Sequence, residues 1–168
     1  MVVCNFKTAK KVFYRGDRII KAYYGGNLIF GKINYALNEA SMSFTSPSYW
    51  SASTPRSSIS LRKPLKFKII FDEANFRDIN RFALSMAVSQ YGRTSFFNEY
   101  FYPRDGQVVS VGNRSYRVFE YTKTWDRRPP SSFGTSDYWF VLYFESYYSI
   151  GRGNIENLQP KISVWEAN

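Results

Sequence analysis

The stretch Phe82-Ala83-Leu84-Ser85-Met86-Ala87-Val88-Ser89 carries the clearest structural signal in this chain of 168 residues. Large apolar side chains alternate strictly with small ones along it. Because successive residues of a strand point to opposite faces, this period of two predicts a β-strand. Alanine, leucine and methionine are also good helix formers, so a helix is the alternative. The strict alternation favours the strand.

Strand patterns recur on both sides of this stretch. Residues 65–71 alternate apolar and basic side chains and then become fully apolar, as in a strand that becomes buried. Residues 138–144 form a continuous apolar run, which suits a central strand covered on both faces. The remaining patterns are 108–111 and 116–121, which flank the turn signal Gly112-Asn113, and 161–165. Five or six strands with long loops predict an all-β fold, a β-sandwich, with the jelly roll as one form of it. Between two of these strands, residues 72–78 fit one helical turn with Asp72 as its cap.

A ten-residue tandem repeat precedes this region. Lys11-Val12-Phe13-Tyr14-Arg15-Gly16-Asp17-Arg18-Ile19-Ile20 is followed at once by Lys21-Ala22-Tyr23-Tyr24-Gly25-Gly26-Asn27-Leu28-Ile29-Phe30. The pairs Gly16-Asp17 and Gly26-Asn27 supply the positive φ that two-residue hairpin loops require, because Gly lacks a Cβ and Asp or Asn tolerates the left-handed region. Residues 11–30 therefore predict a ribbon of three short strands. Such a ribbon is marginally stable alone and needs a surface to lie against.

The chain is strongly basic and aromatic. Its net charge is +10, and 14 Tyr, 15 Phe and 4 Trp make up 20% of the residues. Residues 1–35 contain seven basic residues and one acidic residue, Asp17, so this fifth of the chain carries +6. The lysines could protect exposed strand edges, dock the ribbon on an acidic protein surface, or contact nucleic acid. Aromatic enrichment favours β structure and also protein interfaces.

Several classes of chemistry are excluded by composition. Cys4 is the sole cysteine and there is no histidine. An intramolecular disulfide, a cysteine-based zinc site, Ser-His-Asp and Cys-His nucleophiles and imidazole ligation of a metal are therefore all excluded. No apolar run approaches the roughly 20 residues that a membrane-spanning helix needs. The first residues lack the pattern of a secretory signal, so we expect a soluble protein made and assembled inside a cell.

The composition changes between the repeat and the main strand patterns. Residues 36–60 are rich in Ser, Thr and Pro and poor in periodicity. They are typical of a linker or long loop. The expected organisation is thus an attachment ribbon over 1–35, a linker over 36–60 and a β-sandwich domain over 61–168.

Candidate catalytic groups are few. Asp72 and Glu73 are neighbours in sequence, and adjacent strand residues face opposite sides. Glu99, Glu120 and Glu145 are far apart in sequence, so only the fold could bring two of them to glycosidase spacing. The glycine-rich run 151–154 is not followed by the Lys-Ser/Thr of a phosphate-binding loop. We therefore expect no enzyme, no metal site and no cofactor.

Aromatic residues outside the best strand patterns are candidates for ligand stacking. They are Tyr49 and Trp50 in the Ser-rich stretch, Trp125 beside a basic and proline-rich run, and Tyr147-Tyr148. Exposed aromatic rings on a β-sandwich stack on sugars or on a protein partner. The alternative is that each ring folds back over the edge of the core.

Residues 13–32, Phe13-Tyr14-Arg15-Gly16-Asp17-Arg18-Ile19-Ile20-Lys21-Ala22-Tyr23-Tyr24-Gly25-Gly26-Asn27-Leu28-Ile29-Phe30-Gly31-Lys32, resemble a hairpin cassette near one end of tailed-bacteriophage structural proteins. The cassette has the form aromatic-x-Gly-Asp-x-x-Ile-Lys-x-Tyr-x-Gly-x-x-Leu-Ile-aromatic. The resemblance implies a virion component in which this ribbon serves for attachment or oligomerisation.

The sequence thus favours a non-enzymatic structural protein of a bacteriophage virion, in its tail, neck, fibre or capsid decoration, assembled in the host cytoplasm. Its expected partners are other virion proteins and copies of itself. The expected partner-binding residues are Phe13, Tyr14, Ile19, Tyr23, Tyr24, Ile29 and Phe30, with Lys11 and Lys21 steering the approach. One alternative is a carbohydrate-binding module or receptor-binding head, which would display aromatic residues at one site. A second, less favoured alternative is a nucleic-acid-binding protein with a continuous basic groove.

Overall fold

The computed structural model describes residues 12–14, 17–19, 22–24, 27–30, 33–45, 49–76, 79–88, 95–125, 137–145 and 155–167, and between 12 and 30 it describes the strand backbones. The chain divides into two compact units, Met1–Asn34 and Tyr35–Asn168. Each unit is considered by itself below. None of the helices in the described part of the chain has the length and apolar character needed to cross a lipid bilayer.

The N-terminal unit contains two separate hairpins. Strand β1 (Val12–Tyr14) pairs with β2 (Asp17–Ile19), and β3 (Ala22–Tyr24) pairs with β4 (Asn27–Phe30), in both cases antiparallel. The expected meander of three strands is therefore wrong. The physical reason lies in the repeat itself, because each ten-residue copy holds two strand segments around one turn signal. Each copy consequently closes on itself as a hairpin.

Two of the residues expected in the turns, Asp17 and Asn27, lie in strands instead. Asp17 pairs with Tyr14 and Asn27 pairs with Tyr24, so both belong to strands. The two glycines expected in the turns, Gly16 and Gly26, lie outside the described residues.

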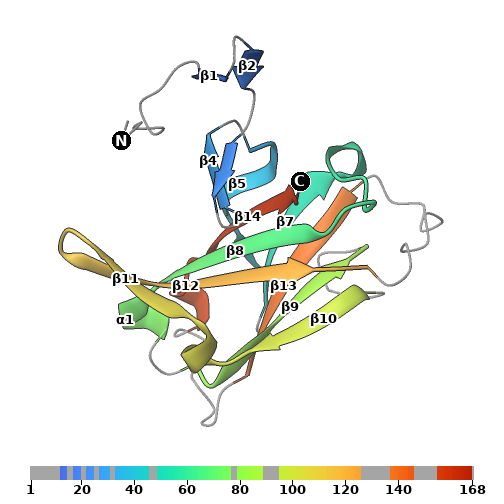
Figure 1. Ribbon diagram of the computed structural model, residues 1–168. Helices are drawn as coiled ribbons and strands as arrows, with labels where there is room; N and C mark the ends of the chain where they lie inside the picture. Colours follow the sequence, from blue (N-terminus) through green and yellow to red (C-terminus); the bar gives the residue numbers. More distant parts are fainter. Residues whose placement is uncertain are drawn as a thin grey trace. The chain divides into compact units, whose positions relative to one another are not determined.

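The second unit is a β-sandwich of two antiparallel five-stranded sheets (Figure 1), which confirms the predicted fold class. The β8 sheet has the order β11-β12-β8-β14-β5 and the β9 sheet has the order β10-β9-β13-β7-β6. The strands of the β8 sheet are β5 (Tyr35–Ser41), β8 (Leu65–Asp72), β11 (Gln107–Val111), β12 (Arg114–Lys123) and β14 (Lys161–Glu166). Those of the β9 sheet are β6 (Ser43–Thr45), β7 (Tyr49–Pro55), β9 (Arg81–Ala87), β10 (Ser95–Phe101) and β13 (Asp137–Glu145).

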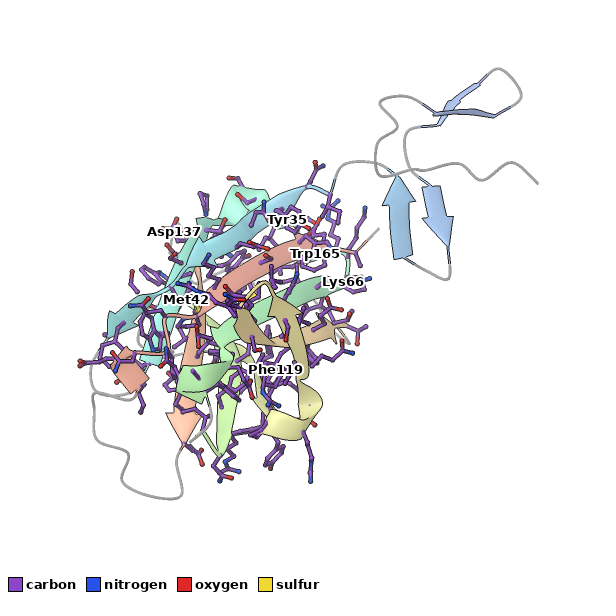
Figure 2. The ribbon with its side chains drawn as sticks, turned by 90° about the vertical axis from the view of Figure 1, so that its left-hand side faces the viewer. Tyr35, Met42, Lys66, Phe119, Asp137 and Trp165 are labelled. Atoms are coloured by element: carbon purple, nitrogen blue, oxygen red, sulfur yellow. The ribbon has the colours of Figure 1, made fainter. Side chains whose placement is uncertain are left out.

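An aromatic core fills the space between the sheets. The phenylalanines Phe71, Phe82 and Phe119 meet edge to face, with ring centroids 5.3 Å apart for Phe71 and Phe82 and 4.9 Å apart for Phe82 and Phe119. Figure 2 labels Phe119 within this layer of side chains. Edge-to-face rings are a favourable arrangement because the positive ring edge meets the negative ring face. Much of the chain's aromatic content therefore serves the core.

The strand patterns read from the sequence are confirmed. Positions in β8 alternate between buried and half-buried, as the apolar and basic pattern of residues 65–71 predicts. Residues 82–87 of the alternating stretch lie in β9, which ends before Val88, and the apolar run at 138–144 lies in β13, whose residues Phe140, Val141 and Leu142 are fully buried. Gly112, with a φ of 59°, begins the turn of the β11–β12 hairpin.

A short helix follows β8, as expected. It is α1 (Glu73–Phe76), and the backbone N–H of Ala74 donates to Asp72 Oδ1 at 3.0 Å. A side-chain acceptor at this position satisfies a backbone donor that has no partner within the helix. The predicted cap is therefore confirmed.

The Ser-rich stretch 36–60 is not a linker. It supplies β5, β6 and β7, and β7 pairs along its length with β13 in the middle of the β9 sheet. Its small polar residues Ser51 and Thr54 are buried, and Met42 and Trp50 anchor the stretch in the core. The sandwich therefore begins near residue 35, well before the expected boundary at 61.

Candidate functional site

An open pocket of about 440 Å³ lies on the outer face of the β8 sheet. Lys68, Ile70 and Asp72 belong to its lining, and these positions of β8 alternate with the buried residues that face the core. The pocket thus forms on the side of the sheet that faces away from the other sheet. Every strand of the β8 sheet contributes at least one lining residue.

The floor of the pocket is apolar. Ile70 lies directly opposite Val118 of β12, and Tyr116 of β12 lies between Asp72 of β8 and Val109 of β11. Side chains directly opposite each other on neighbouring strands share a face and touch. The floor is therefore a strip of aliphatic side chains with one tyrosine.

One wall of the pocket comes from the segment that precedes β14. Asn157, Leu158 and Gln159 line the pocket from this segment, and Asn75 of α1 joins them by donating from Nδ2 to the carbonyl of Asn157 at 3.0 Å. Leu158 is fully buried, so the segment is fixed by its own side chain. Gln159 has a positive φ of 39°, which turns the chain sharply into β14.

Two further hydrogen bonds hold this wall from the core side. Trp50 Nε1 donates to the carbonyl of Ile155 at 2.9 Å, and the N–H of Met42 donates to the carbonyl of Pro160 at 3.2 Å. Buried hydrogen bonds of this kind fix position because breaking them leaves polar groups without a partner. The wall is consequently held in position by the protein itself, without a ligand.

Charged side chains of both signs surround the apolar floor. The cations are Lys68, Lys161 and Arg114, and the acids are Glu39 and Asp72. None of the three cations forms an ion pair with a residue that the structure describes. Lys161 lies opposite Ile70 and Lys68 lies opposite Ser163, so the two lysines are diagonal neighbours on adjacent strands. Their ammonium groups are free to donate to a ligand.

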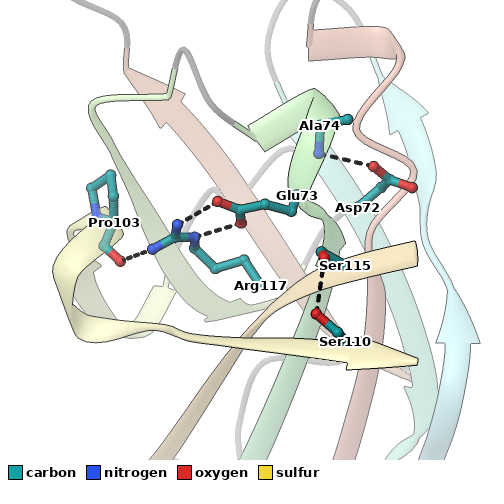
Figure 3. A network of polar contacts seen from close by, with 7 residues as sticks. All are labelled: Asp72, Glu73, Ala74, Pro103, Ser110, Ser115 and Arg117. Carbon is teal, nitrogen blue, oxygen red and sulfur yellow. Dashed lines mark hydrogen bonds and ion pairs between the residues drawn. The ribbon is translucent and has the colours of Figure 1, made fainter. Parts of the chain in front are cut away.

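A second polar network lies beside the pocket and is shown in Figure 3. Arg117 Nε donates to Glu73 Oε2 at 2.7 Å, its Nη2 pairs with Glu73 Oε1, and its Nη1 donates to the carbonyl of Pro103 at 2.7 Å. The hydrogen bond from Arg117 lowers the pKa of Glu73, and the same contact raises the pKa of Arg117. With each of its three side-chain nitrogens donating to a protein group, this arginine joins β12, α1 and the turn before β11. Its role is structural.

The residues expected to stack on a ligand do not form one site. Trp50 is only 6% exposed and packs against Phe44, so the expectation that it stacks on a ligand is wrong. Tyr49 is half-buried against Tyr143, with centroids 5.1 Å apart, and burial raises the pKa of Tyr143. Trp125 packs on Phe97, and its buried Nε1 has no partner among the described residues. Large rings cover the core edge here because their area is most favourably removed from water. Residues 147 and 148 lie outside the described residues.

The expected partner-binding residues of the ribbon stay a prediction. Phe13, Tyr14, Ile19, Tyr23, Tyr24, Ile29 and Phe30 lie in strands whose backbones alone are described, and Lys11 and Lys21 lie outside the described residues.

The three glutamates considered for hydrolysis have different surroundings. Tyr121 donates its hydroxyl to Glu99 Oε2 at 2.9 Å, and burial together with this contact raises the pKa of Tyr121 to about 12. Glu145 pairs with Arg81 at 2.5 Å at the end of β13. Glu120 is exposed on β12, on the opposite face of the β8 sheet from Tyr121. These carboxylates therefore do not converge on one place. Residues 151–154 lie outside the described residues.

No family model matches the chain, and no curated protein matches it. Among solved structures it is similar to Caldicellulosiruptor saccharolyticus CBM27-1, a carbohydrate-binding module, in complex with mannohexaose. The identity is 12% and the TM-score 0.41, and the match covers 72% of this chain and 66% of that one.

Proposed function

We propose that this protein is a non-enzymatic binding module whose β-sandwich recognises a carbohydrate chain in the pocket on the outer face of the β8 sheet. The observation that carries the proposal is the composition of that pocket. An apolar strip of Ile70, Val118 and Tyr116 is surrounded by amide groups and by lysine, arginine and carboxylate groups, and the two lysines form no ion pair with a described residue.

This arrangement matches the chemistry of a sugar. A pyranose ring has an apolar face of C–H groups and an edge of hydroxyl groups that both donate and accept hydrogen bonds. Tyr116, Ile70 and Val118 can contact the apolar face. Asn157, Gln159 and the flanking charged groups can exchange hydrogen bonds with the hydroxyls.

The fixed wall supports the same function. The segment 155–160 is held by Trp50, Met42 and its own Leu158. A site that is ordered in advance loses less conformational entropy when it binds a ligand. More of the free energy of its polar contacts therefore contributes to affinity.

The carbohydrate proposal is tested by calorimetry of the full chain against a panel of soluble oligosaccharides. Tyr116→Ala is expected to weaken the best ligand about 10-fold, the effect of roughly 1.4 kcal/mol. The matched control is Tyr100→Ala, which removes an exposed tyrosine from β10 in the other sheet. Equal losses from both variants, binding of no saccharide, or cleavage of the ligand would each contradict the proposal.

We further propose that the N-terminal unit attaches this module to a larger assembly, such as a bacteriophage particle. The supporting observations are the cassette resemblance over residues 13–32 and the division of the chain at residue 34. Immunogold labelling of purified particles tests it, with a chain lacking residues 1–34 as control. The proposal predicts labelling with the full chain alone, and equal labelling with both chains would refute it.

A further inference from the structure

Among the sheet edges in the described part of the chain, that of β11 differs from the others because nothing in the strand blocks pairing with another strand. The four outermost strands are β10 and β6 in the β9 sheet and β11 and β5 in the β8 sheet. Unpaired edges invite pairing with another chain, and proteins usually block them with bulges, charges or very short strands. β10 has a register shift after Ser95, β6 has three residues, and β5 is irregular against β14 and contains Glu39 at a φ of 46°.

Strand β11 has none of these protections. Its residues Gln107-Val108-Val109-Ser110-Val111 include no charge and no proline, and its register with β12 is continuous. All five residues are exposed, with Val108 at 52%, Val109 at 42% and Val111 at 65%. Figure 1 shows the β11–β12 hairpin extending beyond α1. An uncharged, regular edge with three exposed valines is the kind of strand that pairs with another.

The hairpin geometry fixes which backbone groups face outward. The two-residue turn Gly112-Asn113 makes Val111 and Arg114 a hydrogen-bonded pair. Hydrogen-bonded and non-hydrogen-bonded pairs alternate along an antiparallel ladder, so Val109 and Gln107 also bond to β12. The N–H and C=O groups of Val108 and Ser110 therefore point away from the sheet.

We propose that β11 pairs antiparallel with β11 of a second copy of this chain, across a two-fold axis at Val109. In this register Val108 faces Ser110 of the second copy and Ser110 faces its Val108. All four outward groups of each strand are then satisfied using strand residues alone. Val109 meets Val109 of the second copy as a close, non-hydrogen-bonded pair.

The argument for a second copy as the occupant is that β11 is complementary to itself about Val109. Copies of a chain with a net charge of +10 repel each other, but β11 places no charge opposite its symmetry mate, so this edge avoids that repulsion at the contact. Self-pairing also brings the exposed valine at the axis against its own equivalent, as isologous contacts require.

The pairing has a consequence for the pocket, and this part rests on the proposed function. Val109 and Val111 line the pocket. A two-fold axis perpendicular to the sheet keeps both outer faces on the same side. The two pockets would therefore lie next to each other across the axis, and one saccharide chain could engage both with increased avidity.

Cysteine cross-linking of the full chain tests the register without any ligand. Each variant is made with Cys4→Ser, so that the introduced thiol is the sole one. Opposed residues at a non-hydrogen-bonded position have Cα atoms about 4.5 Å apart, within disulfide range. Val109→Cys should therefore form a covalent dimer under mild oxidation at least 10-fold faster than Ser110→Cys or Val111→Cys. Equal rates at all three positions would indicate random collision and overturn the proposal.

Sedimentation of the same chain gives a second, independent measurement. The wild type should dimerise, and Ser110→Pro, which removes one outward N–H while leaving the bonds to β12 intact, should raise the dimer dissociation constant at least 10-fold. Val109→Lys should also raise the dimer dissociation constant at least 10-fold, because it places two positive charges opposite each other and leaves the backbone donors unchanged. Thermal melts of both variants verify that they fold. A monomeric wild type, or dimerisation that both variants preserve, would rule the interface out, and saccharide binding by that monomer would still leave the proposed function standing.

Discussion

Arg117 and Glu73 form a two-point ion pair that joins the β11–β12 hairpin to the helical turn after β8. Both side chains are less than a third exposed, at 18% and 27%. A partly buried pair with fork geometry is stronger and less screened than an exposed one. It holds the pocket floor and the exposed edge strand in one position.

We predict that breaking this pair destabilises the sandwich. Arg117→Met leaves Glu73 without its partner and should lower the free energy of unfolding by about 1.5–3 kcal/mol, the usual range for charged hydrogen bonds. The matched control is Arg81→Met, which breaks the more exposed pair with Glu145 and should lower the free energy of unfolding much less. Urea denaturation measures both, and equal losses would contradict the prediction.

The same pair should contribute to acid sensitivity. Arg117 lowers the pKa of Glu73 in the folded state. Near this pKa the folded state therefore binds fewer protons at Glu73 than the unfolded state does. The contribution is therefore present above the usual glutamate value of 4.5 and is lost as pH falls below it. Glu73→Gln should be less stable than wild type at pH 7, and the difference should shrink towards pH 3. A constant difference across this range would show that the carboxylate charge is not responsible.

Alkaline pH should act through Tyr121. Its pKa is raised to about 12, so the folded state favours the neutral phenol. Stability from this source is complete below the ordinary tyrosine value of 10.0 and is lost as pH rises towards 12. Because the pKa of Tyr143 is raised as well, absorbance titration of the phenol groups should show one fewer late-ionising tyrosine in Tyr121→Phe than in the wild type. An unchanged titration curve in that variant would assign the late ionisation elsewhere.

Loss of the indole hydrogen bond should loosen the pocket wall. Trp50→Phe removes the donor to Ile155 and should cost roughly 1–3 kcal/mol, because a buried carbonyl is left unpaired. Amide exchange in residues 155–159 should accelerate selectively. Trp165→Phe is the control, since this ring packs edge to face on Tyr35 at the other end of β14 from residues 155–159 (Figure 2). Exchange that accelerates equally in both variants would count against a specific anchor.

Removal of residues 1–34 should leave the sandwich folded. The chain divides at residue 34, and the ordered core lies within residues 35–168. Differential scanning calorimetry of the shortened chain should show one cooperative transition with a melting temperature within about 5 °C of the full chain, a shift of roughly 1 kcal/mol. Non-cooperative melting would mean that the hairpins complete the core.

Local patterns in the sequence were sufficient for some elements and not for others. The strand at 82–87 and the Gly112-Asn113 turn were predictable because period two and turn chemistry are properties of neighbouring residues. Strand β7 was missed because its Ser and Thr residues become strand by pairing with β13, which lies more than eighty positions later. Propensity is a weak guide where tertiary pairing decides.

The pocket could not be derived from the sequence for a related reason. Lys68 and Lys161 are neighbours through the register of β8 with β14, and no local pattern connects them. The sequence showed that alternate residues of β8 and β12, such as Lys68, Ile70 and Val118, point away from the core. It could not show which strands lie side by side. Trp50, an obvious candidate for stacking, is buried in the core, because removing a large ring from water stabilises the folded state more than leaving it exposed.

The position of β14 between β8 and β5 has a consequence for biosynthesis. A ribosome releases β5 and β8 long before Lys161–Glu166, the strand that must be inserted between them. Until then the nascent chain has a gap in the middle of this sheet, with the backbone groups on both sides unpaired. Folding of the sheet is therefore tied to the arrival of a late segment, and strand edges on both sides of the gap are open to incorrect pairing until it is inserted.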